Sequence, residues 1–178
     1  MNKKELGEKI YQASHIRGHF KLRSGQISDE YFDKYLFETD PQLLTEIASR
    51  LKKLVPKDTQ VLAGLEMGGI PLATAISIQT GIPVVFVRKK AKEYGTCKLA
   101  EGIEVRDKTA CIVEDVVTTG GQIIMSANDL KQLGAITKTV LCVIERDKTC
   151  RQKLDEKGLE LLSLFSMEEL QPNANSAN

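Results

Sequence analysis

The chain has 178 residues, which is the size of one compact domain with at most a short appendage. Its 25 basic and 24 acidic residues leave a net charge of +1, which argues against a surface that wraps nucleic acid. No apolar run approaches the roughly 20 residues that a membrane helix needs, and the start MNKKELGEKI is too charged for a signal peptide. We therefore expect a cytoplasmic protein without a nucleic-acid or membrane partner.

The N-terminal region differs in pattern from the rest of the chain. We expect a helix over Lys3 to Ala13 and strands over His19 to Leu22 and Tyr31 to Phe37, around the polar turn 24–26. The predicted division is an N-terminal region of residues 1–38, a core of 39–170 and a disordered tail of 171–178.

The helix predicted after Asp40 has the clearest signals in the chain. Asp40 can cap it and Pro41 can occupy its first position. The spacing of the apolar residues places one group on a single face: Leu43, Leu44, Ile47, Ala48, Leu51 and Leu54.

Two strand–helix–strand cycles follow this helix. The first contains strand Val61 to Leu65, a helix over about 71–79 and strand Pro83 to Val87; the second contains strand Thr109 to Asp115, a helix over about 122–133 and strand Thr137 to Glu145. Continuous apolar strands that alternate with helices predict an α/β fold with a mainly parallel sheet. Residues 88–107, between the cycles, form a long polar segment without clear periodicity, which is usually either functional or disordered.

Two adjacent carboxylates, Glu114 and Asp115, come at the end of a predicted buried strand. The following residues, Val116 to Gly121, contain two threonines and two glycines and open the next helix. Backbone N–H groups at a helix start and threonine hydroxyls can bind a phosphate, while the carboxylates can accept hydrogen bonds from the hydroxyls of a sugar. The alternative is an ordinary strand-to-helix turn with acidic caps.

The segment IVEDVVTTGG (112–121) resembles the phosphoribosyl-diphosphate (PRPP) motif of the type I phosphoribosyltransferases. Three further segments, FKLRSG (20–25), RKKAKEYG (88–95) and IERD (144–147), resemble the orotate-using members of that family. With residues 64–71, the resemblance extends from about Gly18 to Phe165. It implies a mainly parallel sheet flanked by helices, with residues 1–38 as a small hood, and Mg²⁺-dependent transfer of the 5-phosphoribosyl group from PRPP to orotate.

The resemblance also implies residue roles in PRPP binding. Lys89, Glu114 and Asp115 would be catalytic, and residues Glu66, Met67, Gly68 and Gly69 would form a diphosphate loop. Loop 88–95 would close over the site of the neighbouring subunit in a homodimer. The implied PRPP-binding residues are Arg88, Lys89, Lys92, Tyr94, Glu114, Asp115, Val116, Val117, Thr118, Thr119, Gly120, Gly121 and Gln122. The chain departs from many orotate enzymes in having Gly68 instead of lysine and Tyr94 instead of histidine.

The implied orotate-binding residues are Arg23, Phe32, Thr118 and Arg146. Arg146 would pair with the orotate carboxylate, for which a bidentate guanidinium is the natural partner; the alternative is a surface ion pair with Asp147 or Glu145. Mg²⁺ would be held through PRPP and diphosphate oxygens, with no direct protein ligand. Two other functions stay open: a transferase of the same fold for another nucleobase, and a PRPP-sensing regulator without catalysis.

Overall fold

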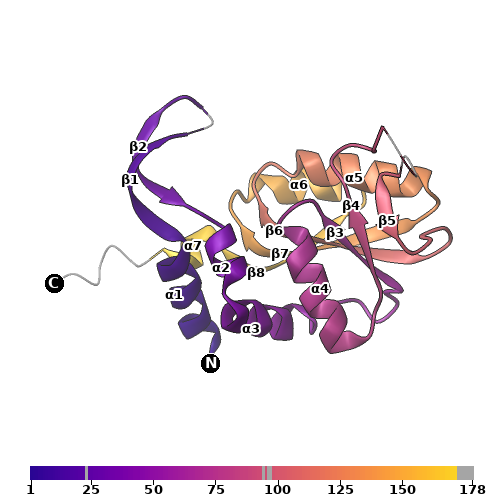
Figure 1. The fold of residues 1–178 in the computed structure, drawn as a ribbon, viewed down its shortest axis with the longest axis horizontal. Coiled ribbons are helices and arrows are strands. Elements are labelled where there is room, and N and C mark those ends of the chain that lie inside the picture. The colour runs from indigo at the N-terminus through magenta and orange to yellow at the C-terminus, as the bar shows by residue number, and fades with distance from the viewer. Residues whose placement is uncertain (23, 94, 96–97, 172–178) are drawn as a thin grey trace.

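The computed structural model describes residues 1–22, 24–93, 95 and 98–171 (Figure 1). Along the chain its elements are α1 (Lys3–Ser14), β1 (His15–Lys21), β2 (Ile27–Phe32), α2 (Tyr35–Thr39), α3 (Pro41–Leu51), β3 (Val61–Leu65), α4 (Gly69–Thr80), β4 (Val84–Val87), β5 (Ala100–Gly102), β6 (Thr109–Val117), α5 (Gly121–Gln132), β7 (Ile136–Glu145), α6 (Thr149–Asp155), β8 (Glu160–Ser166) and α7 (Met167–Leu170).

The main sheet has the strand order β5-β4-β3-β6-β7-β8. All neighbouring strands are parallel except β4 and β5, which are antiparallel. Strands β3 and β6 are therefore central, and the carboxyl ends of β3, β6 and β7 lie at one edge of the sheet. This arrangement confirms the predicted mainly parallel α/β fold, and it gathers the loops that follow these strands into one region.

Two hydrophobic layers cover the two faces of the sheet. On one face, Leu62 and Leu141 pack in a cluster with α1, α3 and α4. On the other face, Ile112 and Val140 pack in a cluster with α5 and α6. Figure 1 shows α3 and α4 on the opposite side of the sheet from α5 and α6. Helices on both faces explain why the central strands are mostly apolar, with Glu114 and Asp115 as exceptions near the end of β6.

The hood contains an antiparallel hairpin, β1–β2, that projects from the body of the molecule (Figure 1). Helix α1, in contrast, packs on the sheet, because its Leu6 and Ile10 are completely buried in the same cluster as α3 and α4. The division of the chain at residue 38 stays a prediction, and residues 172–178 of the predicted tail lie outside the described residues.

The predicted strand from Tyr31 to Phe37 is wrong beyond Phe32. The Asp33 carboxylate accepts a hydrogen bond from the backbone N–H of Tyr35 at 3.1 Å, which turns the chain into helix α2. Alternating large apolar residues imitate a strand here, but Phe37 is instead a buried helical residue. The sequence prediction also missed the short β5 inside segment 88–107, and the elements α6, β8 and α7 after Glu145.

The predicted start of helix α3 is confirmed. The Asp40 carboxylate accepts hydrogen bonds from the N–H groups of Gln42 and Leu43, and Pro41 is the first helical residue.

Within the described part of the chain, no helix has the length and apolar character that crossing a membrane requires.

Candidate active site

The loop after β6 is the predicted phosphate-binding turn. Strand β6 continues to Val117, two residues past its predicted end, so Glu114 and Asp115 lie inside the strand. Gly120 has a φ of 74°, in the left-handed region that favours glycine, and α5 begins at the next residue. The first N–H groups of α5 have no partner within the helix, so they are available to an anion at this turn.

A pocket surrounds this turn. Its lining includes the hood residue Lys34, Lys89 and, from the diphosphate loop, Glu66 and Met67. The remaining lining residues are Tyr35, Glu114, Val116, Val117, Thr118, Thr119, Gly120, Gly121, Gln122 and Ile123. The structure therefore brings most of the predicted PRPP-binding residues to one pocket, which we call the phosphate-loop pocket.

Asp115 lies beside this pocket in a buried ion pair. The Lys34 ammonium is 2.6 Å from the Asp115 carboxylate oxygen Oδ2, and the aspartate side chain has no solvent exposure. The buried carboxyl of Glu38 lies near the Asp115 carboxylate, because both carboxyls border the space next to Gly68. Sequence analysis missed Lys34 and Glu38, although their spacing of four residues around a short helix could have placed them on one face.

The charges of this cluster follow from burial and proximity. Burial and the neighbouring Asp115 raise the pKa of Glu38 to about 9. The same two causes raise the pKa of Glu114 well above its usual value. Burial opposes ionisation of Asp115, but hydrogen bonds and the Lys34 ammonium outweigh it and lower the pKa of that carboxyl. At neutral pH the cluster thus pairs the Asp115 anion with the Lys34 cation beside a protonated Glu38, and burial disfavours ionisation of Glu114.

The diphosphate loop packs directly against β6. A Cβ atom at residue 68 would overlap Oδ2 of Asp115 and would lie 2.8 Å from the Glu38 carboxyl. A Cβ atom at residue 69 would overlap the carbonyl oxygen of Val113. Residue 69 must therefore be glycine, because backbone fills the space of a Cβ atom, whereas any other residue at position 68 would have to displace the carboxylates of Asp115 and Glu38.

The predicted loop cations do not all reach the pocket in this chain. Lys89 lines it, and its backbone N–H donates to the Glu66 carboxylate at 3.0 Å. Lys92 instead pairs with Glu101 of β5. Arg88 is not part of the pocket lining, and Tyr94 lies outside the described residues.

A larger cavity of about 910 Å³ lies between the hood and the ends of β6 and β7. Phe32, Thr118 and Arg146 line it together, as the sequence predicted for an orotate pocket, and we call it the base pocket. Phe32 packs near the Tyr11 ring, with centroids 6.4 Å apart. Arg23 lies outside the described residues.

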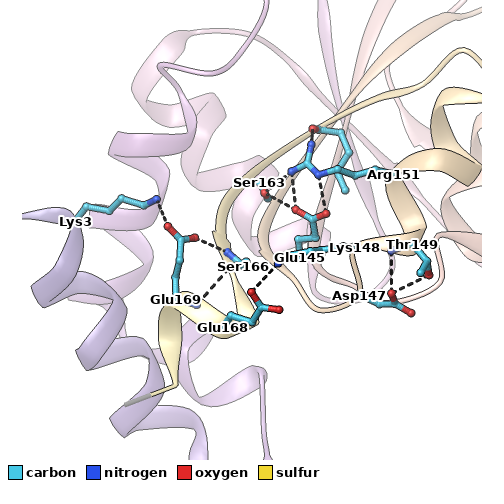
Figure 2. Close-up of polar contacts among 11 residues, drawn as sticks. Lys3, Glu145, Asp147, Lys148, Thr149, Arg151, Ser163, Ser166, Glu168 and Glu169 are labelled. Carbon is cyan, nitrogen blue, oxygen red and sulfur yellow. Dashed lines mark hydrogen bonds and ion pairs between the residues drawn. The ribbon is translucent and has the colours of Figure 1, made fainter. Parts of the chain in front are cut away.

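The segment that carries Arg146 is held by polar contacts on both sides (Figure 2). The buried Glu145 carboxylate accepts two hydrogen bonds from the Arg151 guanidinium, at 2.7 and 2.6 Å. The Asp147 carboxylate accepts from the backbone N–H and the hydroxyl of Thr149, at 2.9 and 2.8 Å. Both carboxylates proposed as surface partners of Arg146 are thus occupied by other donors, and Arg146 remains exposed in the base pocket.

Comparisons with known proteins show the family of the chain. A family model described as the phosphoribosyl transferase domain matches residues 37–165, which is more than half of the chain. The chain belongs to the phosphoribosyltransferase family.

Individual relatives show which members of the phosphoribosyltransferase family the chain is similar to. An orotate phosphoribosyltransferase of Nocardioides sp. is 47% identical over 165 residues, covering 93% of this chain and 92% of that protein. The crystal structure of Mycobacterium tuberculosis orotate phosphoribosyltransferase with Fe(III) dicitrate has a TM-score of 0.86 and 29% identity, covering 96% of this chain and 99% of that one. A complex of the M. tuberculosis enzyme with PRPP has a TM-score of 0.80 and 27% identity, covering 94% and 98%. Within its family, the chain is placed with the orotate phosphoribosyltransferases.

Proposed function

We propose that this chain transfers the 5-phosphoribosyl group of PRPP to orotate, which yields orotidine 5′-monophosphate and diphosphate. One observation carries the proposal. The phosphate-loop pocket and the base pocket share Lys34, Tyr35, Val116 and Thr118 in their linings. A phosphoribosyl group and a base that occupy the two pockets would therefore meet at the end of β6, where C1 of the ribose must approach the base.

The β6 turn is the proposed site of the ribose phosphate. N–H groups at the start of α5 and the hydroxyls of Thr118 and Thr119 would donate to the phosphate oxygens. Glu114, on the pocket wall, and Asp115 behind it are proposed to fix the ribose hydroxyls. Binding the phosphate and sugar at one turn would orient C1 toward the base pocket.

Departure of diphosphate is the step that needs cations. The bond from C1 to the diphosphate breaks as the bond to the orotate nitrogen forms, and the proton of that nitrogen leaves to solvent, so negative charge develops on the leaving group. Lys89 and the backbone of Met67 to Gly69 are proposed to face this charge. Mg²⁺ would neutralise part of the diphosphate charge when bound. The ion would be held by PRPP and diphosphate oxygens, with no direct protein ligand, and the oxygen atoms of Glu66, Thr118 and Thr119 in the pocket lining suit its water shell.

Orotate recognition is assigned to Arg146. Its exposed guanidinium in the base pocket is free of the neighbouring carboxylates of Glu145 and Asp147, which bind other donors. A planar guanidinium can form two parallel hydrogen bonds with the orotate carboxylate. Phe32 would pack near the pyrimidine ring, and the Thr118 hydroxyl would donate at the junction of the two pockets.

The active unit is proposed to be a homodimer in which loop 88–95 of one subunit serves the site of the other. This assignment and the cytoplasmic location stay predictions. Lys89 lines the pocket of its own chain, and the mixed-subunit experiment in the Discussion distinguishes a shared site from a site within one subunit.

The proposed reaction is tested with a panel of bases. The purified protein is incubated with PRPP and Mg²⁺ and with orotate, uracil, adenine, guanine or xanthine in turn. We expect orotate to be consumed with stoichiometric release of diphosphate. Consumption of another base with orotate untouched would contradict the substrate assignment, and PRPP binding without consumption of any base would favour a regulator.

A further inference from the structure

Lys34 occupies a place that the functional proposal does not explain. It comes from the segment between the hood hairpin and α2, yet its ammonium reaches the buried carboxylate of Asp115 in β6, at 2.6 Å. It also lies over the ring of Tyr35, 5.2 Å from the centroid. Lys34 is thus the link between the hood and the strand that carries the phosphate-binding turn.

The Lys34 side chain is buried on one side and open on the other. About a third of its surface is exposed, at 34%, whereas Asp115 has none. Lys34 lines both the phosphate-loop pocket and the base pocket. The ion pair therefore has its anion in the protein interior and its cation at the wall of the site.

The Lys34 ammonium has more N–H donors than the contact with Asp115 uses. A lysine ammonium has three N–H donors, and among the described residues its one ion-pair partner is Asp115. The remaining donors are available on the side of the pockets. Burial opposes protonation of Lys34, but the contact with Asp115 outweighs it and raises the pKa of the ammonium, so the cation persists at neutral pH.

The negative charge of PRPP, the expected ligand, is complementary to the Lys34 ammonium. PRPP carries a phosphate and a diphosphate, and the described lining of the phosphate-loop pocket contains two lysines, Lys34 and Lys89, beside two acids, Glu66 and Glu114. Lys89 belongs to the loop predicted to close, whereas Lys34 is fixed by Asp115 before any ligand arrives. A fixed cation binds an anion without the entropic cost of ordering a long side chain.

We propose that Lys34 is a PRPP-binding residue, whose ammonium is held by Asp115 at the junction of the two pockets and donates to an oxygen of PRPP. The inference rests on the proposed function, because it assigns a further ligand contact to the same site. It gives the buried Asp115 a second role, which is to position this cation.

The test compares PRPP binding by calorimetry in Lys34→Met, Lys34→Arg and the wild type. Lys34→Met keeps the aliphatic stem and removes the charge; Lys34→Arg keeps the charge. Lys4→Met is the matched control, because Lys4 is an exposed lysine of α1 that pairs only loosely with Glu8, at 3.9 Å. We expect about 10- to 100-fold weaker PRPP binding in Lys34→Met, substantial rescue in Lys34→Arg and no change in Lys4→Met.

A structural role alone would lower the unfolding temperature of Lys34→Met and leave the PRPP affinity of the folded protein unchanged, which would overturn the proposal. If Lys34→Met does not fold, Lys34→Gln decides, because its amide can still donate to Asp115 but lacks the charge. Wild-type PRPP affinity in folded Lys34→Gln would overturn the proposal. If the wild type does not bind PRPP, both this inference and the proposed function are overturned. If the wild type binds PRPP and the Lys34 variants bind it equally well, the inference alone is contradicted.

Discussion

Gly68 and Asp115 are in such close contact that a side chain at residue 68 would have to displace the Asp115 carboxylate as it is placed in this chain. A Cβ atom at residue 68 would overlap the Asp115 carboxylate, which is already paired with Lys34. The two central strands thus place the diphosphate loop and the phosphate-binding turn side by side, and a change in either one displaces the other.

Gly68→Ala is expected to impair PRPP use by displacing Asp115. Overpacking at such a contact costs about 1–3 kcal/mol of unfolding free energy, and we expect kcat/KM for PRPP to fall at least about tenfold. The control is Gly158→Ala: Gly158 has a positive φ, 71°, which Gly68 lacks, so this change strains the backbone, but no atom lies where its Cβ would be. Equal activity of the two variants would show that the Gly68 contact does not matter for the site.

Glu38 makes the folded protein sensitive to alkaline pH. Its pKa is raised by burial from 4.5 to about 9, so between these values the folded state holds a proton that the unfolded state has lost. The stability contributed by this proton is complete below pH 4.5 and is lost as pH rises through 9. Glu38→Gln, a neutral isostere, should therefore flatten the decline in unfolding free energy between pH 7 and pH 9.

Urea unfolding at several pH values measures this slope. Glu8→Gln is the matched control, since Glu8 lies at the exposed surface of α1. A slope for Glu38→Gln that equals the slopes of wild type and Glu8→Gln would contradict a protonated Glu38 in the folded protein.

Arg151 is expected to stabilise the segment that carries Arg146 (Figure 2). Arg151→Ala leaves the Glu145 carboxylate buried, with the Ser163 hydroxyl as its one remaining side-chain donor among the described residues. We expect a loss of about 2 kcal/mol in unfolding free energy, because the Arg151 end of the pair is partly exposed, together with a higher KM for orotate. Lys148→Ala breaks an exposed ion pair with Glu168 in the same segment and should change neither quantity. Similar results for the two variants would contradict the stabilising role of Arg151.

A mixture of two inactive variants tests whether sites are shared between subunits. Lys89→Ala and Asp115→Asn should each be nearly inactive as homodimers. After unfolding and refolding together, about half of the dimers are hybrids, and a shared arrangement gives each hybrid one intact site. Activity should then return to about one quarter of wild type. A mixture as inactive as its parents, with hybrids confirmed by different tags, would show that Lys89 serves its own chain.

Local signals in the sequence predicted much of the fold. The Asp40 cap, Pro41 and the apolar spacing defined α3, and the apolar strands with the Thr-Gly turn located β6 and α5. These signals act between neighbouring residues, so they can be recognised without a structure. Helix α2 was missed because its alternating apolar residues imitate a strand, and because the turn at Asp33 depends on one side-chain hydrogen bond.

Contacts between residues far apart in the sequence could not be predicted from sequence patterns. The motif indicated Glu114 and Asp115, but no periodicity links Asp115 to Lys34 in the hood or to Gly68 in the diphosphate loop. The Arg146 segment is a similar case, because the pairing of Glu145 with Arg151 depends on the position of α6 against β8. The sequence predicted the types of residue in the site, and only the structure shows their partners.

The central claim is that the two adjoining pockets divide the substrates between them, with PRPP at the β6 turn and orotate at Arg146. Arg146→Ala tests it most directly, by PRPP calorimetry beside steady-state kinetics in orotate. The account predicts a KM for orotate raised by about 10- to 100-fold, the loss of a charge-assisted pair, with the PRPP affinity unchanged. Equal losses for both substrates, or none for orotate, would contradict it.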